Sequence, residues 1–165
     1  GGLAALVLVG FVLFGILDRS GAFQREISQT VTVGIYQDGE QVGETAVTID
    51  GSLHWLGKRS FWGTFAIKAV EKTCREKTYG NIFWRRGVME GYQEIRWNRP
   101  GLSWTEVGVR PDGYVSPDLR YFAVTLADGR VVATDEALAA LQALTPCRYA
   151  LDWQEEAPFM YVHRG

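Results

Sequence analysis

The sequence predicts a mainly β protein, an antiparallel barrel or sandwich with one late packed helix, preceded by one N-terminal transmembrane helix. Three observations lead to this fold class. The first residues, 1–17, contain no charged or strongly polar side chain. About eight short segments of alternating or aromatic-rich sequence follow, separated by Gly, Pro and Asp. One later segment has the spacing of an amphipathic helix. A run of strands followed by a single helix indicates a barrel or sandwich.

The apolar segment Gly1–Leu17 ends abruptly at Asp18 and Arg19. A membrane span needs about 20 apolar residues, within a range of roughly 17–25, so this run is at the lower limit. The chain begins without Met, and in a longer protein the apolar run could be longer. A secretory signal peptide is one alternative, because Ser20-Gly21-Ala22 could form a cleavage site. A buried core helix is another. We expect an anchor whose residues 3–17 contact membrane lipid.

An anchor of this kind divides the chain into three parts. Residues 1–19 are the predicted anchor helix, 20–26 a linker, and 27–165 an extracytoplasmic β-rich domain. The composition, 47% hydrophobic and 13% aromatic, excludes a disordered domain. We therefore expect a single-pass protein of the cell membrane, although the flanking charges leave the orientation open.

The first predicted hairpin covers residues 24–49. Apolar residues alternate along 27–35, which is typical of a half-buried strand, and Asp38-Gly39 supplies a turn. Asp50-Gly51 predicts a second turn. A strand is predicted over 60–70, where Gly63 indicates a bulge or a close backbone approach.

A charged loop or exposed turn at 71–78 precedes three predicted aromatic strands. The strands cover residues 79–84, 92–97 and 104–109. The turns between and after them are predicted at Pro100-Gly101 and Pro111-Asp112-Gly113. A second hairpin is predicted from 121–126 and 130–133 around Ala127-Asp128-Gly129, and a last short strand or extended tail over 148–153.

The predicted soluble helix covers Asp135–Leu144. Thr134 can cap it, its first two residues are acidic, and leucines recur every third position along one face. Pro146 is predicted to stop it.

Charge is unevenly distributed, although the net charge is only −2. Residues 58–110 hold eleven Lys and Arg against five Asp and Glu, and the rest of the chain holds six against fourteen. A basic middle could face lipid head groups or a cell-wall polyanion. Ordinary charge scatter over solvated strand faces is the simpler interpretation.

The two cysteines, Cys74 and Cys147, lack metal-ligand spacing, so the sequence predicts no metal site and no cofactor. They could form one disulfide in an oxidising compartment, or stay as two thiols.

No nucleophile elbow, phosphate-binding loop or paired-histidine motif is present. His54 could act as a base with Asp50 and with Ser52 or Ser60, as in a hydrolase. A lone histidine of this kind is more often a surface residue, and His163 lies near the frayed end. Carboxylate pairs are available as Asp112 with Asp118 and as Asp135 with Glu136, but turn and helix-start roles explain them better. An enzyme is therefore less expected than a non-catalytic protein.

Aromatic residues suggest a binding surface. The candidate ligand or partner surface consists of Trp62, Trp84, Arg85, Arg86, Trp97 and Trp104. Tryptophan and arginine are common in interface hot spots, and aromatic rings also stack on sugars. A core role for most of the tryptophans is the competing interpretation. A single-stranded nucleic-acid surface would also combine these residue types, but we expect no nucleic-acid partner for an anchored, acidic protein.

Two segments carry a weak resemblance to a known group. Residues 55–67 contain Gly57-Lys58, Phe61, Gly63 and Phe65, and residues 113–144 contain Tyr114, Ser116, Asp118, Asp128-Gly129 and Glu136-Ala137. In these the chain resembles uncharacterised small membrane-anchored or lipoprotein-like proteins of Gram-positive, spore-forming bacteria. The resemblance implies the architecture above and no activity.

The function expected from the sequence is that of a membrane-anchored extracytoplasmic module, which binds a protein partner or another copy of itself in a membrane complex without catalysis. A module that binds cell-envelope glycan or polyanion is the first alternative. A hydrolase with a site near His54 is the second. The sequence does not identify the partner, the ligand or the oligomeric state.

Overall fold

The computed structural model of the protein describes residues 2–19, 23–84, 92–98 and 104–148. Side chains at 18–19, 92–94, 98, 104–105, 112 and 143–148 lie outside that description. The predicted tail strand at 148–153 falls almost wholly outside it.

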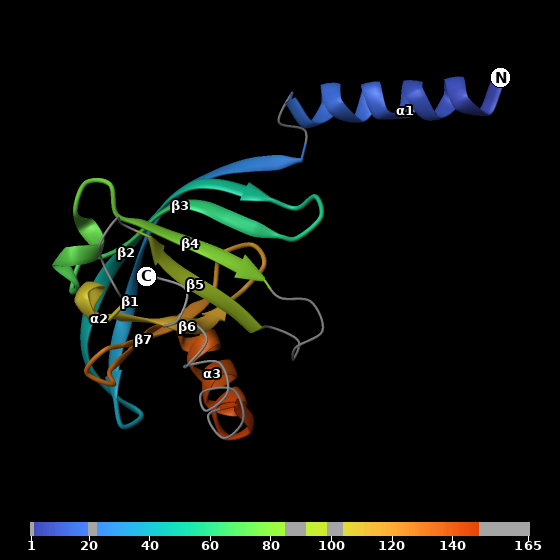
Figure 1. Ribbon diagram of the computed structural model, residues 1–165. Coiled ribbons are helices and arrows are strands. Elements are labelled where there is room, and N and C mark those ends of the chain that lie inside the picture. Colours follow the sequence, from blue (N-terminus) through green and yellow to red (C-terminus); the bar gives the residue numbers. More distant parts are fainter. Residues whose placement is uncertain (1, 20–22, 85–91, 99–103, 149–165) are drawn as a thin grey trace, which may run out of the picture.

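Eight antiparallel strands among the described residues form a closed barrel in sequence order (Figure 1). They are β1 (Gln24–Gln37), β2 (Glu40–His54), β3 (Ser60–Ile67), β4 (Tyr79–Trp84), β5 (Tyr92–Asn98), β6 (Val109–Val115), β7 (Phe122–Leu126) and β8 (Val131–Ala133). The pairing of β1 with β8 closes the sheet. The prediction of a mainly β antiparallel fold is therefore confirmed, and the barrel alternative holds.

Apolar side chains fill the barrel interior. An eight-stranded barrel has an interior just wide enough for side chains to fill. Alternate residues of each strand point inward, and most of these are aliphatic or aromatic. The largest fully buried ones are Phe61, Phe65, Phe122, Ile49, Ile67, Ile82, Ile95 and Leu119. Phe65 lies edge-on to Phe122 and Trp97, with ring centroids 5.2 and 5.8 Å away respectively.

The hairpin of β1 and β2 turns at Asp38 and Gly39, as predicted. Both residues have positive φ, 53° and 84°, which is the geometry of a two-residue type I′ turn. Asp and Gly adopt this conformation more readily than other residues.

The second predicted turn, at Asp50-Gly51, is wrong, because β2 continues through it to His54. Gly51 pairs with Gly63 of β3, and the two backbones approach closely there. A Cβ atom on Gly63 would overlap the carbonyl oxygen of Asp50, and one on Gly51 would overlap that of Trp62. The close approach predicted at Gly63 is thus confirmed, and it explains why Gly51 also lacks a side chain.

The predicted strand at 104–109 is also wrong. Its residues form a short helix, α2 (Trp104–Val107), and Gly108 with φ of 90° connects this helix to β6. The predicted turn at Pro111-Asp112-Gly113 lies inside β6, at an irregularity of the pairing with β7. Proline has no amide hydrogen, so a strand irregularity is one of the few places where a sheet accepts it.

The exposed turn predicted at 71–78 contains a short 3₁₀ helix, η1 (Glu71–Cys74). The second hairpin is confirmed as β7 and β8, joined through Asp128 and Gly129.

The late helix is confirmed as α3 (Asp135–Arg148), which continues past Leu144 so that Pro146 lies in its last turn. Thr134 precedes it, and its carbonyl accepts the first helical bond, from the amide of Leu138. The predicted side-chain cap differs in detail, because the Thr134 hydroxyl bonds to the backbone of Phe122. The helix covers the outer face of the barrel over a second apolar cluster of Tyr36, Ala123, Ala133 and Ala137.

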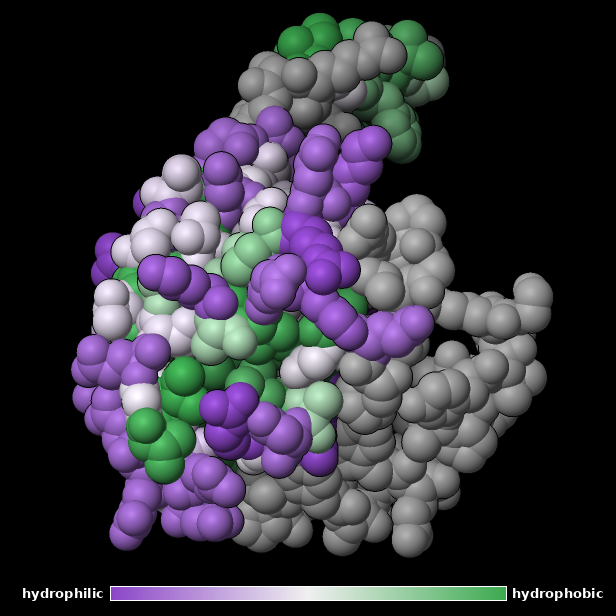
Figure 2. Space-filling model, turned by 90° about the vertical axis from the view of Figure 1, so that its left-hand side faces the viewer, coloured by the Kyte–Doolittle hydropathy of each residue, from purple (hydrophilic) through white to green (hydrophobic). Residues whose placement is uncertain are grey.

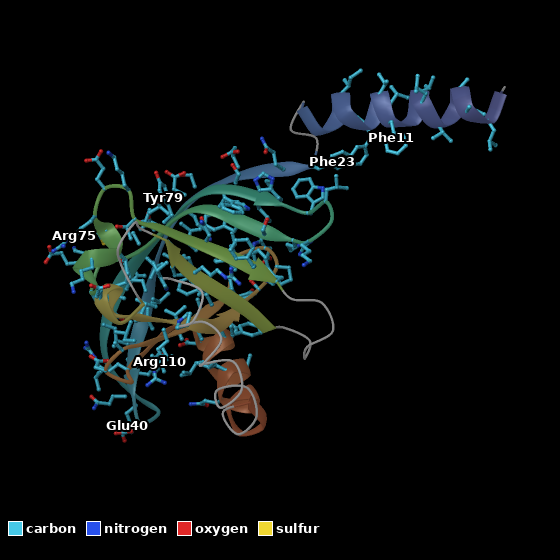
Figure 3. The ribbon with its side chains drawn as sticks, in the orientation of Figure 1. Phe11, Phe23, Glu40, Arg75, Tyr79 and Arg110 are labelled. Atoms are coloured by element: carbon cyan, nitrogen blue, oxygen red, sulfur yellow. The ribbon has the colours of Figure 1, made fainter. Side chains whose placement is uncertain are left out.

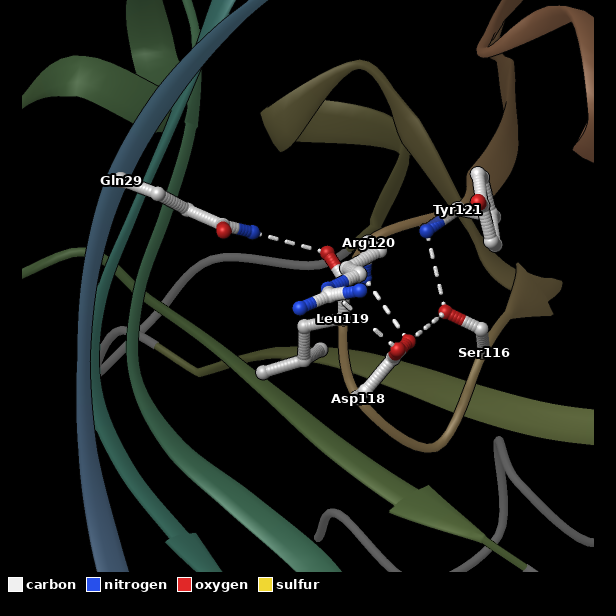
Figure 4. Close-up of polar contacts among 6 residues, drawn as sticks. All are labelled: Gln29, Ser116, Asp118, Leu119, Arg120 and Tyr121. Carbon is white, nitrogen blue, oxygen red and sulfur yellow. Dashed lines mark hydrogen bonds and ion pairs between the residues drawn. The ribbon is translucent and has the colours of Figure 1, made fainter.

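The loop between β6 and β7 folds Leu119 into the barrel core (Figure 4). The Gln29 side-chain amide on β1 donates to the Leu119 carbonyl at 2.8 Å. Within the loop, the Ser116 hydroxyl donates to Asp118 at 2.6 Å and accepts from the Tyr121 amide at 3.0 Å. Hydrogen bonds within the loop, and one hydrogen bond from β1, therefore hold the loop in place.

The N-terminal segment is helical, as predicted, and forms α1 (Gly2–Arg19). It projects away from the barrel beyond the start of β1 (Figure 1). The rings of Phe14 and Phe23 stack with centroids 5.9 Å apart. Among the described residues, no helix reaches the length and apolarity needed to cross a membrane.

Candidate binding surface

The structure separates the six residues of the predicted surface. Trp62 points outward from β3, and 49% of its surface is exposed. Trp97 points into the barrel and is 5% exposed, so its side chain belongs to the core. Trp84 is half-buried against the core, and its indole N–H donates to the Val115 carbonyl at 3.0 Å. Arg85, Arg86 and the Trp104 side chain lie outside the described residues.

Trp62 belongs to a group of outward-facing side chains on three neighbouring strands, together with Phe83 of β4 and Arg96 of β5. The Trp62 and Phe83 rings meet edge-on, with centroids 5.2 Å apart and planes at 87°. The Arg96 guanidinium carbon lies 5.2 Å from the centre of the Phe83 ring, within the range of a cation–π interaction. We call these three residues the tryptophan ledge.

Neighbouring polar side chains hold the tryptophan ledge in place. The Trp62 indole N–H donates to the Ser60 hydroxyl at 3.0 Å. The Asn81 side-chain oxygen accepts from the Gly63 amide at 3.1 Å and ties β4 to β3 beside the ring. A ring that is fixed before a partner arrives loses less conformational entropy on binding.

The partner surface predicted from the sequence did not include Phe83 and Arg96. The signal for Phe83 was the alternation along β4, because Ile82 is fully buried and its neighbour must point the other way. Arg96 is recognised only from its position beside Phe83, which depends on the pairing of β4 with β5. Chemically, the ledge offers a partly exposed indole and a guanidinium, two groups that are enriched in binding hot spots.

The structure places His54 directly opposite Ser60 in the pairing of β2 with β3, but it does not assemble the whole predicted hydrolase site. Asp50 and His54 lie four residues apart on the same strand, a separation of roughly 13 Å at about 3.3 Å per residue. The Ser52 hydroxyl donates to Glu26 at 2.6 Å, and the Ser60 hydroxyl accepts from Trp62. Neither serine is bonded to His54.

Two of the four carboxylates considered for catalysis, Asp118 and Asp135, have structural partners. Asp118 accepts from Ser116 and from the Arg120 amide. Burial alone would raise the pKa of Asp118, but these hydrogen bonds and the positive charge of Arg120 outweigh it and lower the pKa. Asp135 accepts the Tyr36 hydroxyl at 2.7 Å. The Asp112 side chain lies outside the described residues.

The described residues contain no group of three His, Cys, Asp or Glu side chains that could hold a metal ion. Cys74 is exposed at the end of η1, and its thiol lies 3.4 Å from the Ile67 carbonyl. The side chain of Cys147, in the last turn of α3, is outside the description, so the disulfide stays a prediction.

Helix α1 presents a second surface. Its large apolar side chains are 46–82% exposed, from Leu17 to Leu3. In Figure 2 the hydrophobic side chains of α1 stand above a barrel face on which hydrophilic residues predominate. No polar face interrupts this surface, since Gly2–Leu17 contains no charged or strongly polar residue.

Comparisons with protein-family models, with curated proteins and with solved structures find no match to this chain. The resemblance to membrane-anchored proteins of spore-forming bacteria therefore stays an expectation.

Proposed function

We propose that this protein is a membrane-anchored, extracytoplasmic binding or assembly module, without catalytic activity, which α1 holds at the cell membrane. The observation that carries the proposal is the exposed apolar surface of α1. Monomeric soluble proteins rarely expose continuous apolar patches of more than a few hundred Å². Burial of this surface in lipid would remove it from water.

Insertion into the bilayer fits α1 better than a position along the bilayer surface. Helices that lie in the membrane interface carry one polar or charged face. Helix α1 is apolar all round between Gly2 and Leu17. At 1.5 Å per residue it is roughly 27 Å long, slightly short of the hydrocarbon thickness of about 30 Å, so the proposal requires local thinning of the bilayer around it.

The tryptophan ledge is the proposed contact for a protein partner or a second copy of the chain. It combines a preorganised aromatic side chain with a cation, and both types of side chain recur at interface hot spots. Helix α1 would confine the barrel to two dimensions, which raises the effective concentration of such a partner.

Purification of the full chain in mild detergent, followed by light scattering and cross-linking, tests the assembly proposal. We expect a complex larger than the monomer. Trp62→Ala and Arg96→Ala should each weaken it at least tenfold. The matched control is Tyr121→Ala, which removes an exposed aromatic side chain on the β6–β7 loop. A monomer without partner, or equal loss in all three variants, would contradict the proposal.

Labelling of Cys74, which is exposed, tests on which side of the membrane the barrel lies. A membrane-impermeant thiol reagent should label it in intact cells, either directly or after reduction if a disulfide with Cys147 forms. Labelling only after lysis would place the barrel in the cytoplasm and overturn the extracytoplasmic part.

One observation favours a second candidate function. A half-exposed indole beside a guanidinium could also stack on a sugar ring while binding an acidic group of an envelope glycan. In that case wild-type protein should sediment with purified cell wall at low salt and be released at high salt, and Trp62→Ala should stay in solution. Absence of wild-type sedimentation at low salt removes this candidate.

A further inference from the structure

A groove separates helix α3 from the outer face of the barrel, remote from the tryptophan ledge. Its volume is about 380 Å³, within the range of roughly 300–1,000 Å³ found for small-molecule sites. Residues from the β1–β2 turn, from β6 to β8 and from α3 line it. Its ligand would be independent of the membrane and assembly roles proposed above.

Arg110 of β6 is the cationic group of this groove (Figure 3). Its Nε atom is buried and has no hydrogen-bond partner among the residues that the structure describes. The ion pairs between described residues join Arg75 to Glu71, Arg120 to Asp118 and Arg130 to Asp128, and none includes Arg110. A buried donor without a partner is unfavourable, so a buried Nε–H at a cavity indicates a place for a bound acceptor.

The other residues that line the groove indicate the chemical character of the rest of the ligand. Val131, Leu138 and Leu141 line the groove with apolar side chains, and Thr125 adds a hydroxyl group. The Tyr36 hydroxyl donates its proton to Asp135, so it has no proton to donate to a ligand. A ligand that fills the groove must therefore be largely apolar, with one group that accepts hydrogen bonds.

The charges around the groove disfavour a dianion more strongly than a monoanion. Asp38 lines the same groove, and Asp135 and Glu44 act electrostatically on Tyr36 at its edge. These carboxylates would repel a dianion such as a phosphate monoester. A carboxylate carries one charge and matches the planar fork of a guanidinium.

We propose that this groove binds a small apolar monocarboxylate, whose carboxylate is held by the Arg110 guanidinium and whose apolar part lies against Val131, Leu138 and Leu141. At about 30 Å³ per non-hydrogen atom, the groove holds a molecule on the order of a dozen such atoms.

Calorimetric titration of the full chain in lipid nanodiscs tests the proposal, with empty nanodiscs subtracted. The probe is 4-phenylbutyrate, which has a suitable size and dissolves as a monomer. We expect it to bind, whereas 4-phenylbutanamide, which lacks the charge, and acetate, which lacks the apolar part, should bind at least tenfold more weakly. No heat of binding for 4-phenylbutyrate at millimolar concentration, or equal affinity for the amide, overturns the proposal.

Two variants locate the site. Arg110→Gln should weaken 4-phenylbutyrate binding at least tenfold without lowering thermal stability, because the buried Nε–H that it removes has no partner among the described residues. Leu138→Trp should also weaken binding by filling the groove while Arg110 is retained. The matched control Arg120→Gln removes an exposed arginine elsewhere and should bind like wild type. Wild-type affinity in both groove variants overturns the assignment.

Discussion

At the residue scale, short-range contacts decide which side chains the barrel tolerates. Gly51 and Gly63 face each other across β2 and β3, and neither position has room for a Cβ atom. The tryptophan ledge begins one residue before Gly63, so the close strand approach also sets where the Trp62 ring lies. The position of the proposed binding residue Trp62 thus depends on the packing of β2 against β3.

Gly63→Ala should destabilise the protein by about 2–4 kcal/mol, because the added methyl group overlaps rigid backbone of β2. Denaturant unfolding followed by tryptophan fluorescence measures this free energy. Gly43→Ala is the control, since its Cβ atom would meet only Ile35 Cδ1 at 3.9 Å. An equal loss of unfolding free energy in the two variants would show that the close approach of β2 and β3 does not cause the destabilisation.

Tyr36 links β1 to α3 through its hydrogen bond to Asp135. Tyr36→Phe removes a bond to a charged acceptor and should cost about 1–2 kcal/mol of unfolding free energy. Tyr79→Phe, an exposed tyrosine on β4, is the matched control and should change little. A loss of stability no larger in Tyr36→Phe than in Tyr79→Phe would contradict this role.

The same contact predicts a pH dependence. The hydrogen bond to Asp135, then burial, then the charges of Asp135 and Glu44 raise the pKa of Tyr36 above 10.0. The folded state therefore holds this proton more tightly than the unfolded state. The stabilisation is complete below pH 10 and is lost as the pH rises through the raised pKa. The stability difference between wild type and Tyr36→Phe should shrink over that alkaline range.

At the element scale, the loop between β6 and β7 depends on a carboxylate. The lowered pKa of Asp118 means that the folded state binds its proton less tightly than the unfolded state. Its contribution is complete above the ordinary value of 3.8 and is lost as the pH falls through the lowered pKa. Because Asp118 is partly exposed, the contribution is about 1 kcal/mol or less.

Asp118→Asn should therefore lower stability at pH 7 and converge with wild type in acid, as measured by thermal unfolding between pH 7 and pH 2. Asp50→Asn, at an exposed carboxylate on β2, is the control. A difference between wild type and Asp118→Asn that persists unchanged in acid would show that the charge of Asp118 has no part in holding the loop.

Elements with a strong local pattern were predictable from the sequence. The hairpin at Asp38-Gly39, the strand at 79–84 and the acidic start of α3 follow from turn chemistry, alternation and helix capping. The wrong predictions of turns and strands occurred at glycine and proline residues. Gly51 permits a close strand approach, Gly108 connects α2 to β6, and Pro111 lies at a strand irregularity. These roles depend on the neighbouring strand, which local sequence does not specify.

At the scale of the whole molecule, barrel closure determines which predicted residues can meet. Inward alternation places Trp97 in the core and leaves Trp62 outside, although both were predicted for one surface. The groove at Arg110 was not predictable, because it combines β1, β6, β7, β8 and α3, which are distant in sequence. Pairing between distant strands, rather than residue type, assembled both surfaces.

The proposed attachment to the membrane depends on α1. If lipid covers this helix, the barrel is a tethered module, and the tryptophan ledge can serve a membrane complex. Charged residues in the centre of the helix would make insertion unfavourable, because each costs roughly 2.5–3.5 kcal/mol at the bilayer centre. They would leave the barrel intact, since its core does not include α1.

Alkaline carbonate extraction of membranes from cells that produce the full chain tests this claim most directly. Wild-type protein should remain in the membrane pellet. The double variant Leu8→Lys and Val12→Lys should move to the supernatant. The control, Val42→Lys with Leu56→Lys, places the same charges at exposed apolar positions of the barrel and should stay in the pellet. Extraction of the wild type, or retention of the α1 variant, would contradict the membrane anchor.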